Sequence, residues 1–591
     1  MAIRLKSSFG EIDFVKPTDF KFADAVSNIA FKLSKELKKS PKEIADEIVK
    51  EIKNFDIFEK VENVNGFVNA FFSKEFLIDF IFRILNDNFI ELEEKKNYII
   101  EFVSANPTGP LNIVNARAGA IGDTLVRIGK YIGHNVISEY YVNDEGNQIL
   151  SLGYSILWRL GFVFSFSSDK KYIEIKRIEN LQEPNIIYID NKIIQIDVYR
   201  GDYVISLSKR VENNVTEMLN SLNKHCENSE IALLNINELA YNVGKISCEV
   251  ILSEQMEVLK NYGINYDVIT KESFIRNSEY PKIILQKLKN YLYFQDLNGN
   301  NYDIEESEIS RLLDKNYYLK NYKDKALLLK TTTFGDDKDR VLIRSNGEPT
   351  YFFWDIAYHY YKILRLKDGY IINLLGPDHY GYIPRLTSAL KMLGFENLSV
   401  LIIQQTNLIK DGKKLDMSKR KGQIYEMKEL IEEVGIDSAR FFFLLRSPSA
   451  HLDFDIDLAK KLSSENPVYY VQYAHARIES IKEHSKAVNI NFEFKKNYLE
   501  NYDFKNERNL IVRALYFEDV IKKAFYNLEP HLIVYYLLEL SEAFHSYYQH
   551  YRVIDIEDKH STIARIIILE AIRKIINVGL SLIGVSAPKK M

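Results

Sequence analysis

The sequence predicts an α/β protein: a parallel-sheet core that carries a long insertion, with a small α/β module before it and an all-helical domain after it. Three observations lead to this prediction. The run YIIEFVSA, residues 98–105, is almost continuously apolar, as in a strand buried on both faces of a parallel sheet. A helical pattern and a second apolar strand follow it, which makes a βαβ unit. From Leu430 onward, apolar residues recur at helical spacing almost throughout.

Size and composition narrow the class of protein. At about 150 residues per domain, a chain of 591 residues makes several domains, or one large enzyme core with appendages. The chain is 46% hydrophobic and 13% aromatic, which excludes a largely disordered protein. Its 78 Lys and Arg against 82 Asp and Glu give a net charge of −4. This balance excludes a wholly basic nucleic-acid coat but leaves room for local basic patches.

Other features of the sequence indicate a cytoplasmic protein. Acidic residues interrupt the N-terminal stretch where a secretory signal needs an apolar run. No stretch approaches the roughly 20 apolar residues of a membrane span, so we expect no membrane association. Only Cys226 and Cys248 are present, too few for a disulfide framework and without the spacing of metal ligands. We interpret both cysteines as buried apolar residues.

The first ninety or so residues predict the small α/β module. Residues 40–43, Ser-Pro-Lys-Glu, supply an N-cap, a proline suited to the first helical turn and the glutamate of a capping box. Apolar residues at helical spacing follow them. The pair Asn65-Gly66 is a hairpin signal ahead of the strand-like FVNAFFS. The charged stretch 91–96 closes the module, and we place a domain boundary near Asn97.

The core begins with a strand, a turn and a helix. After the first strand, the turn 106–110 leads into a predicted helix from Ile113 to Tyr131, with Gly133 as its C-cap, and then into the strand NVISEYYV. The helix N-terminus faces the carboxyl end of the first strand. Such a site favours phosphate, because unpaired backbone N–H groups and the helix dipole point into the crevice.

The remaining core is interpreted as the same sheet, divided by an insertion. Residues from about 155 to 335 are mixed and charged and form the predicted insertion. The α/β pattern resumes at DRVLIRSNGEPTYFF, which contains a hairpin signal, and continues with the strand DGYIINLLG, the helix IPRLTSALKMLG and the strand SVLIIQQ. A loop dense in Lys, Asp and Gly, NLIKDGKKLDMSKRKGQ, then leads to the helical domain at 431–591.

Two segments resemble the signature motifs of class I aminoacyl-tRNA synthetases. The turn and helix start at 106–115 resembles the HIGH-type motif, and residues 413–422 resemble the KMSK-type loop. More specifically, the chain resembles arginyl-tRNA synthetases of the bacterial type, and this resemblance spans its whole length. The segments that carry it include EFVSANPTGPLNIVNARAGAIGDTLVRIG, EYYVNDEGNQ, GPDHYGYIPR, DSARFFFLLRSP, NPVYYVQYAHARI and the terminal GVSAPKKM.

The resemblance implies an architecture and an activity. It implies a tRNA-contacting domain at 1–96, a Rossmann-like catalytic domain at 97–430 and an anticodon-binding domain at 431–591. The implied reaction is the ATP-dependent ligation of L-arginine to tRNA(Arg) through arginyl-adenylate, by a monomer without an obligate protein partner. No cluster of metal ligands is visible in the sequence, so Mg²⁺ is expected to arrive with ATP, held largely by its phosphates.

The HIGH-type motif departs from the family pattern. Asn112 and Asn115 stand in place of its two histidines, and Val114 stands in place of its glycine. Asn amides can still donate neutral hydrogen bonds to phosphate oxygens, but they carry no positive charge. Loss of one transition-state donor costs on the order of a hundredfold in rate. The β-branched Val114 is expected to crowd the adenine.

The KMSK-type loop departs as well. Asp416 replaces its first lysine, and neighbouring basic residues can compensate for the lost charge. Lys419, in the place of the second lysine, is predicted to reach the ATP phosphates. The resemblance assigns catalysis to Asn112, Asn115 and Lys419, and ATP binding to Pro107, Thr108, Gly109, Asn112, Val114, Asn115, Met417, Ser418 and Lys419.

Arginine selection needs carboxylate and hydroxyl acceptors for the planar guanidinium. Tyr351 and Asp355, four residues apart on a predicted helix, share a face and match the family's guanidinium-binding pair. In the helical domain, aromatic and basic side chains suit single-stranded RNA, and the predicted tRNA contacts are Tyr473, His475 and Arg477. The resemblance assigns arginine binding to Glu101, Ser104, Asn106, Tyr351, Asp355 and His379.

Two other interpretations stay open at this point. A synthetase relative that binds tRNA without efficient activation would carry the same altered motifs. A class I nucleotidyl transferase could instead act on another amino acid. We favour a working arginine enzyme, because the predicted amino-acid pocket and the predicted anticodon domain both look intact.

Overall fold

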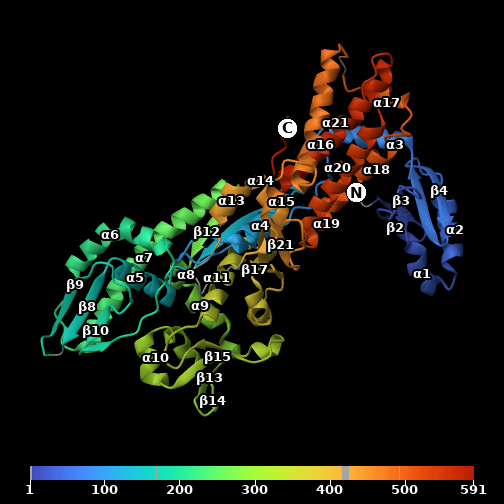
Figure 1. The fold of residues 1–591 in the computed structure, drawn as a ribbon. Coiled ribbons are helices and arrows are strands. Elements are labelled where there is room, and N and C mark those ends of the chain that lie inside the picture. The colour runs from blue at the N-terminus through green and yellow to red at the C-terminus, as the bar shows by residue number, and fades with distance from the viewer. Residues whose placement is uncertain (1–2, 168, 416–424, 491–492) are drawn as a thin grey trace.

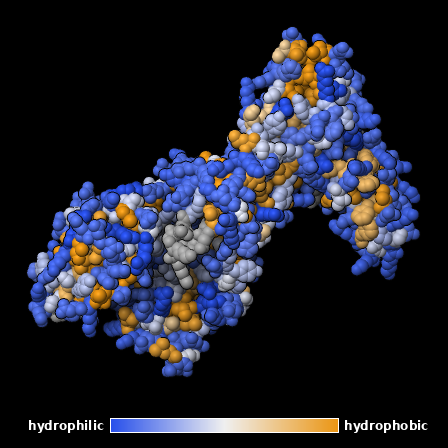
Figure 2. All heavy atoms as spheres, in the orientation of Figure 1, coloured by the Kyte–Doolittle hydropathy of each residue, from blue (hydrophilic) through white to orange (hydrophobic). Residues whose placement is uncertain are grey.

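The computed structural model describes residues 3–167, 169–415, 425–490 and 493–591. The molecule is elongated: the N-terminal module and the helical domain lie at one end, the insertion lies at the other, and the parallel sheet lies between them (Figure 1). Figure 2 shows a mostly hydrophilic face with small, separate groups of hydrophobic side chains. No described helix is both long enough and apolar enough to cross a membrane.

A parallel sheet of five strands forms the core. Its strands are β6 (Asn97–Glu101), β7 (Asn135–Val142), β12 (Val268–Lys271), β17 (Tyr370–Leu375) and β18 (Leu398–Ile402). They lie in the order β12-β7-β6-β17-β18, and every neighbouring pair is parallel. The order along the chain therefore reverses between β6 and β17. In a doubly wound sheet such a reversal opens a crevice at the carboxyl ends of the strands, where ligands bind.

Helices cover both faces of this sheet. Side chains alternate along β6, so that Ile100 joins the apolar cluster containing α4 (Ile113–Tyr131), while Ile99 packs with Leu366 of α11 (Tyr351–Leu366). Both helices are thereby fixed against the strand that borders the crevice. The predicted helix at 113–131 and the predicted strand at 135–142 are confirmed. Other core elements are α8 (Glu272–Arg276), η4 (Pro377–Tyr382) and α12 (Ile383–Met392).

The stretch expected to be one insertion forms two bodies. The first comprises α5 (Asn147–Arg159), β8 (Phe162–Ser167), β9 (Tyr172–Arg177), β10 (Ile187–Ile189), β11 (Lys192–Ile193), α6 (Tyr203–Ser221) and α7 (Ser229–Asn261). The second comprises α9 (Tyr280–Lys287), η1 (Lys289–Tyr291), β13 (Leu292–Asp296), β14 (Asn301–Tyr302), η2 (Glu306–Arg311), α10 (Lys315–Tyr322), β15 (Lys325–Leu329), η3 (Thr331–Phe334) and β16 (Arg340–Ile343).

Two strands belong to different sheets from those that the sequence predicts. Between the two bodies, β12 and α8 return to the core, and the four residues of β12 are too few to show a period in the sequence. The strand β16, expected to resume the core, is instead the edge of the sheet β14-β13-β15-β16. The core sheet therefore resumes only at β17.

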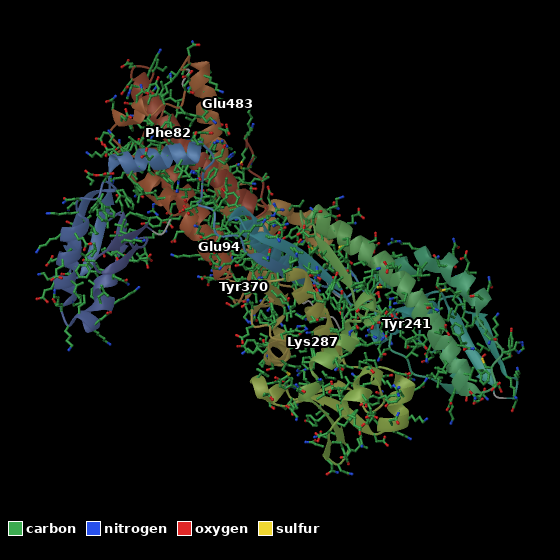
Figure 3. The ribbon with its side chains drawn as sticks, turned by 180° about the vertical axis from the view of Figure 1, so that it is seen from behind. Phe82, Glu94, Tyr241, Lys287, Tyr370 and Glu483 are labelled. Atoms are coloured by element: carbon green, nitrogen blue, oxygen red, sulfur yellow. The ribbon has the colours of Figure 1, made fainter. Side chains whose placement is uncertain are left out.

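The N-terminal module docks on the helical domain. Its elements are β1 (Ile3–Ser7), β2 (Gly10–Phe14), β3 (Ala25–Ser27), α1 (Ile29–Leu37), α2 (Pro41–Ile52), β4 (Phe58–Val64), β5 (Phe67–Phe72) and α3 (Lys74–Leu85). The predicted capping box of α2 and the hairpin at Asn65-Gly66, where both residues have positive φ, are confirmed. Figure 3 shows α3, which carries Phe82, lying against the helical domain. The buried Asp24 accepts a hydrogen bond of 2.6 Å from Arg508 across this contact.

A small sheet with the order β20-β19-β21 stands at the start of the helical domain. Its strands β19 (Thr406–Lys410) and β20 (Lys413–Lys414) lie in the segment expected to be a loop, whereas β21 (Leu452–Asp455) is a strand inside the domain expected to be all helical. The helices of this domain are α13 (Met427–Val434), α14 (Ile436–Phe443), α15 (Ile456–Lys460), α16 (Pro467–Ala487), α17 (Asn497–Glu500), α18 (Arg508–Leu515), α19 (Phe517–Tyr526), α20 (His531–His550) and α21 (Lys559–Leu582).

A buried arginine joins this domain to the core. Arg440 of α14 is fully buried and donates to Asp123 of α4 at 2.5 Å and to the carbonyl oxygen of Ile583, just after α21, at 2.8 Å. Gly584 has φ of +69°, and a Cβ there would lie 2.3 Å from Nε of Arg440. The joint therefore depends on glycine at this position.

Candidate active site

The strand β6 ends in a bent segment at the crevice. Val103 and Ser104 have φ of 70° and 39°, values that non-glycine residues rarely adopt. The Ser104 hydroxyl donates to Oε1 of Glu101 at 2.8 Å and accepts from the backbone N–H of Tyr141 at 3.1 Å. These two bonds hold the chain where it leaves the strand and turns toward α4.

The start of α4 is closed by a reciprocal capping box. Oδ1 of Asn112 accepts from the backbone N–H groups of Val114 and Asn115, at 2.9 and 3.2 Å, and Oδ1 of Asn115 accepts from the N–H of Asn112 at 3.0 Å. The expected phosphate site of unpaired backbone N–H groups is thus partly filled by the protein itself. Among the described residues, neither Nδ2 group donates a hydrogen bond, so both remain available to a ligand. Val114 is 37% exposed on this first turn.

A buried polar network lies beneath the crevice. Nζ of Lys362 on α11 forms an ion pair with the buried Glu101 and donates to Oδ1 of Asn373 at 2.9 Å. Asn373 in turn donates to Nε2 of His359 at 2.7 Å, and Nδ1 of His359 donates to the carbonyl oxygen of Asp355 at 2.7 Å. Burial, together with the nearby Lys362 cation, lowers the pKa of His359 to about 3, so this ring is neutral.

Asp355 is the acidic group of this region that lacks a cation. Its Oδ2 accepts a hydrogen bond from the hydroxyl of Tyr382, and among the described residues it forms no ion pair. Burial, together with the nearby carboxylates of Glu272 and Glu101, raises its pKa to about 7, against the lowering effect of the Tyr382 hydrogen bond and of Lys362. Each of those two carboxylates has its own cation: Arg276 donates to Glu272 at 2.8 Å, and Lys362 pairs with Glu101.

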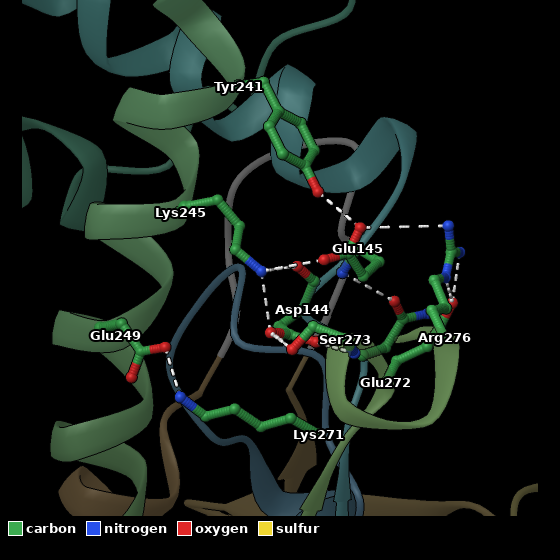
Figure 4. A network of polar contacts seen from close by, with 10 residues as sticks. Asp144, Glu145, Tyr241, Lys245, Glu249, Lys271, Glu272, Ser273 and Arg276 are labelled. Carbon is green, nitrogen blue, oxygen red and sulfur yellow. Dashed lines mark hydrogen bonds and ion pairs between the residues drawn. The ribbon is translucent and has the colours of Figure 1, made fainter. Parts of the chain in front are cut away.

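A second polar network stands where β7 meets the first body of the insertion (Figure 4). Nζ of Lys245 on α7 contacts Asp144 at 2.8 Å and Glu145 at 3.1 Å, and Ser273 donates to Asp144 through both its backbone N–H and its hydroxyl. Burial acts to raise the pKa of Asp144, but these hydrogen bonds outweigh it and the pKa is lowered. The network ties the insertion to the carboxyl end of the core sheet.

The sequence pattern identifies Glu101 and Asp355 but not Asp144, Glu145 or Glu272. Asp144 and Glu145 lie in the segment EYYVNDEGNQ, which carries the family resemblance but no assigned site residue, and Glu272 lies inside the predicted insertion. The adjacent pair Asp144-Glu145, placed just after a core strand, is the signal that could have identified the second network. Glu272 offers no comparable signal.

The turn 106–110 is held by helices of the insertion. The hydroxyl of Tyr203 on α6 donates to the carbonyl oxygen of Thr108 at 2.6 Å, and Nε2 of Gln255 on α7 donates to that of Gly109 at 2.8 Å. Asn106 donates through Nδ2 to Gln148 at 2.7 Å. Pro107 is buried in the same turn. The turn is therefore positioned by the insertion as well as by the core.

The remaining predicted arginine-site residues lie at the rim. Tyr351, the first residue of α11, is 49% exposed. Its hydroxyl lies beside Gly146, 3.6 Å from the position that a Cβ would take there. His379 lies on η4 and is exposed, with its ring 6.4 Å from that of Tyr382. The structure therefore groups Glu101, Ser104 and Asp355 closely and places His379 further out.

The basic loop falls partly outside the described residues. Met417, Ser418 and Lys419, together with Asp416, lie there. The described chain on its far side returns to α4: Met427 donates its backbone N–H to the carbonyl oxygen of Leu111 at 2.8 Å.

A buried arginine of α4 contacts the chain next to the small sheet β20-β19-β21. Arg117 donates to the carbonyl oxygens of Gln404, Ser447 and Ala450, at 2.8, 3.0 and 2.9 Å. These carbonyls lie just before β19 and β21. The helix α4, capped by Asn112, is therefore fixed to the segments that lead into β19 and β21.

The predicted tRNA contacts divide into two kinds. Tyr473 and Arg477 are partly exposed on α16, and the Arg477 guanidinium lies 5.1 Å from the Tyr473 ring centre. His475 faces inward instead: it is 2% exposed, and its ring nitrogens contact the carbonyl oxygen of Pro588 at 2.9 Å and Arg573 at 3.0 Å. In this position His475 holds the segment after α21, which is a structural role rather than the predicted RNA contact.

The fold and the site define a class I aminoacyl-tRNA synthetase. A family model described as the catalytic domain of class I (R) tRNA synthetases matches residues 81–293. A model of the arginyl-tRNA synthetase N-terminal domain matches residues 4–72, and one of the DALR anticodon-binding domain matches residues 471–591.

Related sequences show which class I synthetase family the chain belongs to. The arginine–tRNA ligase of Aquifex aeolicus is 38% identical over 98% of this chain and 95% of its own length, and that of Nitratiruptor is 35% identical over 99% and 98%. The chain belongs to the arginyl-tRNA synthetase family and is an ATP-using arginine–tRNA ligase.

Solved structures show the same fold. The arginyl-tRNA synthetase of Thermus thermophilus aligns with a TM-score of 0.72 and 20% identity, covering 98% of this chain and 96% of that one. The enzyme of Plasmodium falciparum aligns with a TM-score of 0.66 and 18% identity, covering 98% and 95%. The arrangement of core, insertion and helical domain is thus shared over nearly the whole chain.

Proposed function

We propose that this ligase recognises the guanidinium of its amino acid through the carboxylate of Asp355. The observation that supports the proposal is the charge pattern of the crevice. Three acidic side chains meet there, two of them carry a cation of the protein, and among the described residues Asp355 carries none. A bound guanidinium supplies the missing charge and can donate two parallel hydrogen bonds to one carboxylate.

The other predicted arginine-site residues surround this position. Tyr351 lies one helical turn before Asp355 and offers a hydroxyl acceptor at the rim. Glu101 and Ser104 form the floor, where Glu101 is neutralised by Lys362 and Ser104 fixes the bend after β6. We propose that Asn106 and His379 contact the amino and carboxylate end of the substrate, because both are exposed and follow the carboxyl ends of β6 and β17.

For ATP, we propose that Asn112 and Asn115 donate through their Nδ2 groups to phosphate oxygens. Their Oδ1 atoms are occupied by the capping box, which leaves the amide N–H groups free and sets their orientation. The turn 107–109 and Val114 border the same space. We propose that Met417, Ser418 and Lys419 complete the ATP site, with Lys419 as the cation that reaches the phosphates and Mg²⁺ carried by ATP.

We propose three functional regions for the whole chain. Residues 1–96 contact tRNA, 97–430 form the catalytic domain and 431–591 bind the anticodon, with Tyr473 and Arg477 as partly exposed contacts for nucleotides. We further propose a cytoplasmic monomer that needs no protein partner.

The test is the charging of total tRNA with each labelled amino acid in turn, with ATP and Mg²⁺ present. We expect arginine alone to be attached. Asp355→Asn should lower kcat/KM for arginine at least about 30-fold, the effect of truncating one partner of a buried charge pair. Asp378→Asn, an exposed carboxylate on η4, is the matched control, and Lys419→Ala should abolish charging. Normal arginine charging by Asp355→Asn would refute the proposed pocket.

A further inference from the structure

The group that contacts Asp355 is a tyrosine from a different element. Tyr382 is the last residue of η4, directly before α12, and its O–H donates to Oδ2 of Asp355. Its ring packs edge-on against Phe352 of α11, with ring centres 6.1 Å apart and planes at 86°. The guanidinium of Arg385 lies 5.2 Å from the ring centre, as a cation over the aromatic face. Three contacts therefore set the direction of this hydroxyl.

The charged surroundings of Asp355 give this hydroxyl its importance. The titratable groups that face Asp355 are Tyr141 from β7, Glu101 from β6, Glu272 from α8, Lys362 from its own helix and Tyr382 from η4. Two of these groups are carboxylates, which favour the protonated form of Asp355. The hydrogen bond from Tyr382 and the charge of Lys362 favour the ionised form. Among the described residues, Tyr382 is the side chain that donates to the Asp355 carboxylate.

We infer that Tyr382 is a positioning residue that contributes to the specificity for arginine, by holding one oxygen of Asp355 and favouring the form of the carboxylate that accepts the substrate guanidinium. This inference rests on the proposed role of Asp355. An ionised carboxylate accepts two hydrogen bonds from a guanidinium, whereas a protonated one carries a donor that opposes a cation. A protonated Asp355 could instead donate to the ureido oxygen of citrulline, the neutral isostere of arginine.

Arg385 strengthens the hydrogen bond from Tyr382 to Asp355. Its charge lowers the pKa of the Tyr382 phenol, although burial and the Asp355 carboxylate keep that pKa well above its ordinary value. A phenol under a cation is a stronger hydrogen-bond donor, so Arg385 acts on Asp355 through Tyr382 without touching it. Removing either side chain should therefore change arginine recognition in the same direction, with the larger change at Tyr382.

The experiment compares Tyr382→Phe, Arg385→Met and Tyr380→Phe in the full-length enzyme. Tyr380 lies two residues away and is 73% exposed, which makes its variant a matched control for loss of a phenol. Arginine KM and kcat are measured by charging of tRNA from pH 6 to pH 9, and citrulline is tested as a competitor. Thermal unfolding of each variant reports whether the fold is retained.

Tyr382→Phe should raise the KM for arginine about 10-fold to 100-fold at pH 7, the worth of a hydrogen bond to a charged group, with a much smaller change in kcat. The fall of KM with rising pH should move to higher pH, because the Asp355 carboxylate loses a hydrogen bond that favours ionisation. Citrulline should compete better than with the unaltered enzyme. Arg385→Met should show a smaller effect of the same sign, and Tyr380→Phe should show none.

Two failures can be told apart. If Asp355→Asn impairs arginine use while Tyr382→Phe matches Tyr380→Phe in KM and in pH profile, the pocket stands and the inference about Tyr382 is refuted. If Asp355→Asn leaves arginine use intact, the proposed pocket itself fails and the inference fails with it. Should Tyr382→Phe fold poorly, the KM and pH profile of Arg385→Met decide the question in the same way.

Discussion

Substitutions at Asn112 can separate its role as the N-cap of α4 from its proposed role as a hydrogen-bond donor to ATP. In Asn112→Ala, the helix α4 loses the oxygen that accepts from two backbone N–H groups, and the variant also loses the amide donor proposed to face ATP. In Asn112→Ser, a hydroxyl keeps the capping function but the amide donor is gone. The two variants therefore share one loss and differ in the other.

The expected magnitudes follow from these bonds. Loss of an N-cap side chain costs about 1–2 kcal/mol at the start of the helix, which should speed amide hydrogen exchange at 113–116 by roughly 5-fold to 30-fold in Asn112→Ala. Asn112→Ser should exchange at nearly the original rate. Loss of one donor to the transition state should lower kcat for tRNA charging by about a hundredfold or more in both variants.

Hydrogen exchange read by mass spectrometry and charging kinetics measure the two effects independently. Full activity of Asn112→Ser would refute the amide as a phosphate donor. Unchanged exchange in Asn112→Ala would instead show that the capping box does not hold the start of α4. Thr387, a partly exposed polar residue on α12, offers a Thr387→Ala control in a different helix.

Three further predictions concern the network, the pH profile and the joint. Lys362→Met leaves Glu101 buried without its cation, so the unfolding free energy should fall by about 3–5 kcal/mol, and adding Glu101→Gln should recover most of it in urea denaturation. Because the pKa of Asp355 is raised to about 7, its ionised fraction rises about tenfold from pH 6 to pH 8. The KM for arginine should fall over the same range. A KM that does not change with pH would contradict the assignment of Asp355 to the guanidinium site. Gly584→Ala places a methyl group 2.3 Å from Nε of Arg440 at positive φ and should lower the thermal midpoint; an unchanged midpoint would show that the joint tolerates displacement.

The long elements of the fold are predictable because their signals are local. The four residues from Ser40 to Glu43 contain the whole capping box of α2, and the apolar run at 98–105 predicts a strand buried on both faces. The box formed by Asn112 and Asn115 is also local, but an asparagine pair can either cap a helix or donate to a ligand. Its spacing alone does not separate the two duties.

The charge network of the site cannot be found in this way. Glu101 and Lys362 are separated by 261 residues, and nothing near either residue indicates the other. Tyr382 stands in a segment that the resemblance already marks, yet its contact with Asp355 depends on how η4 folds back over α11. Such pairings are set by the tertiary structure, so a single sequence gives the groups but not their partners.

The joint around Arg440 has a consequence for how the protein is made. The arginine connects the helix of the catalytic core that carries Asp123 to a carbonyl at residue 583. During synthesis, residue 583 leaves the ribosome long after Asp123 and Arg440. Until then the buried guanidinium lacks one of its acceptors, and the core helix lacks one of its supports. A nascent chain of this enzyme, which itself supplies the ribosome with charged tRNA, therefore completes the support of helix α4 only after residue 583 has been synthesised.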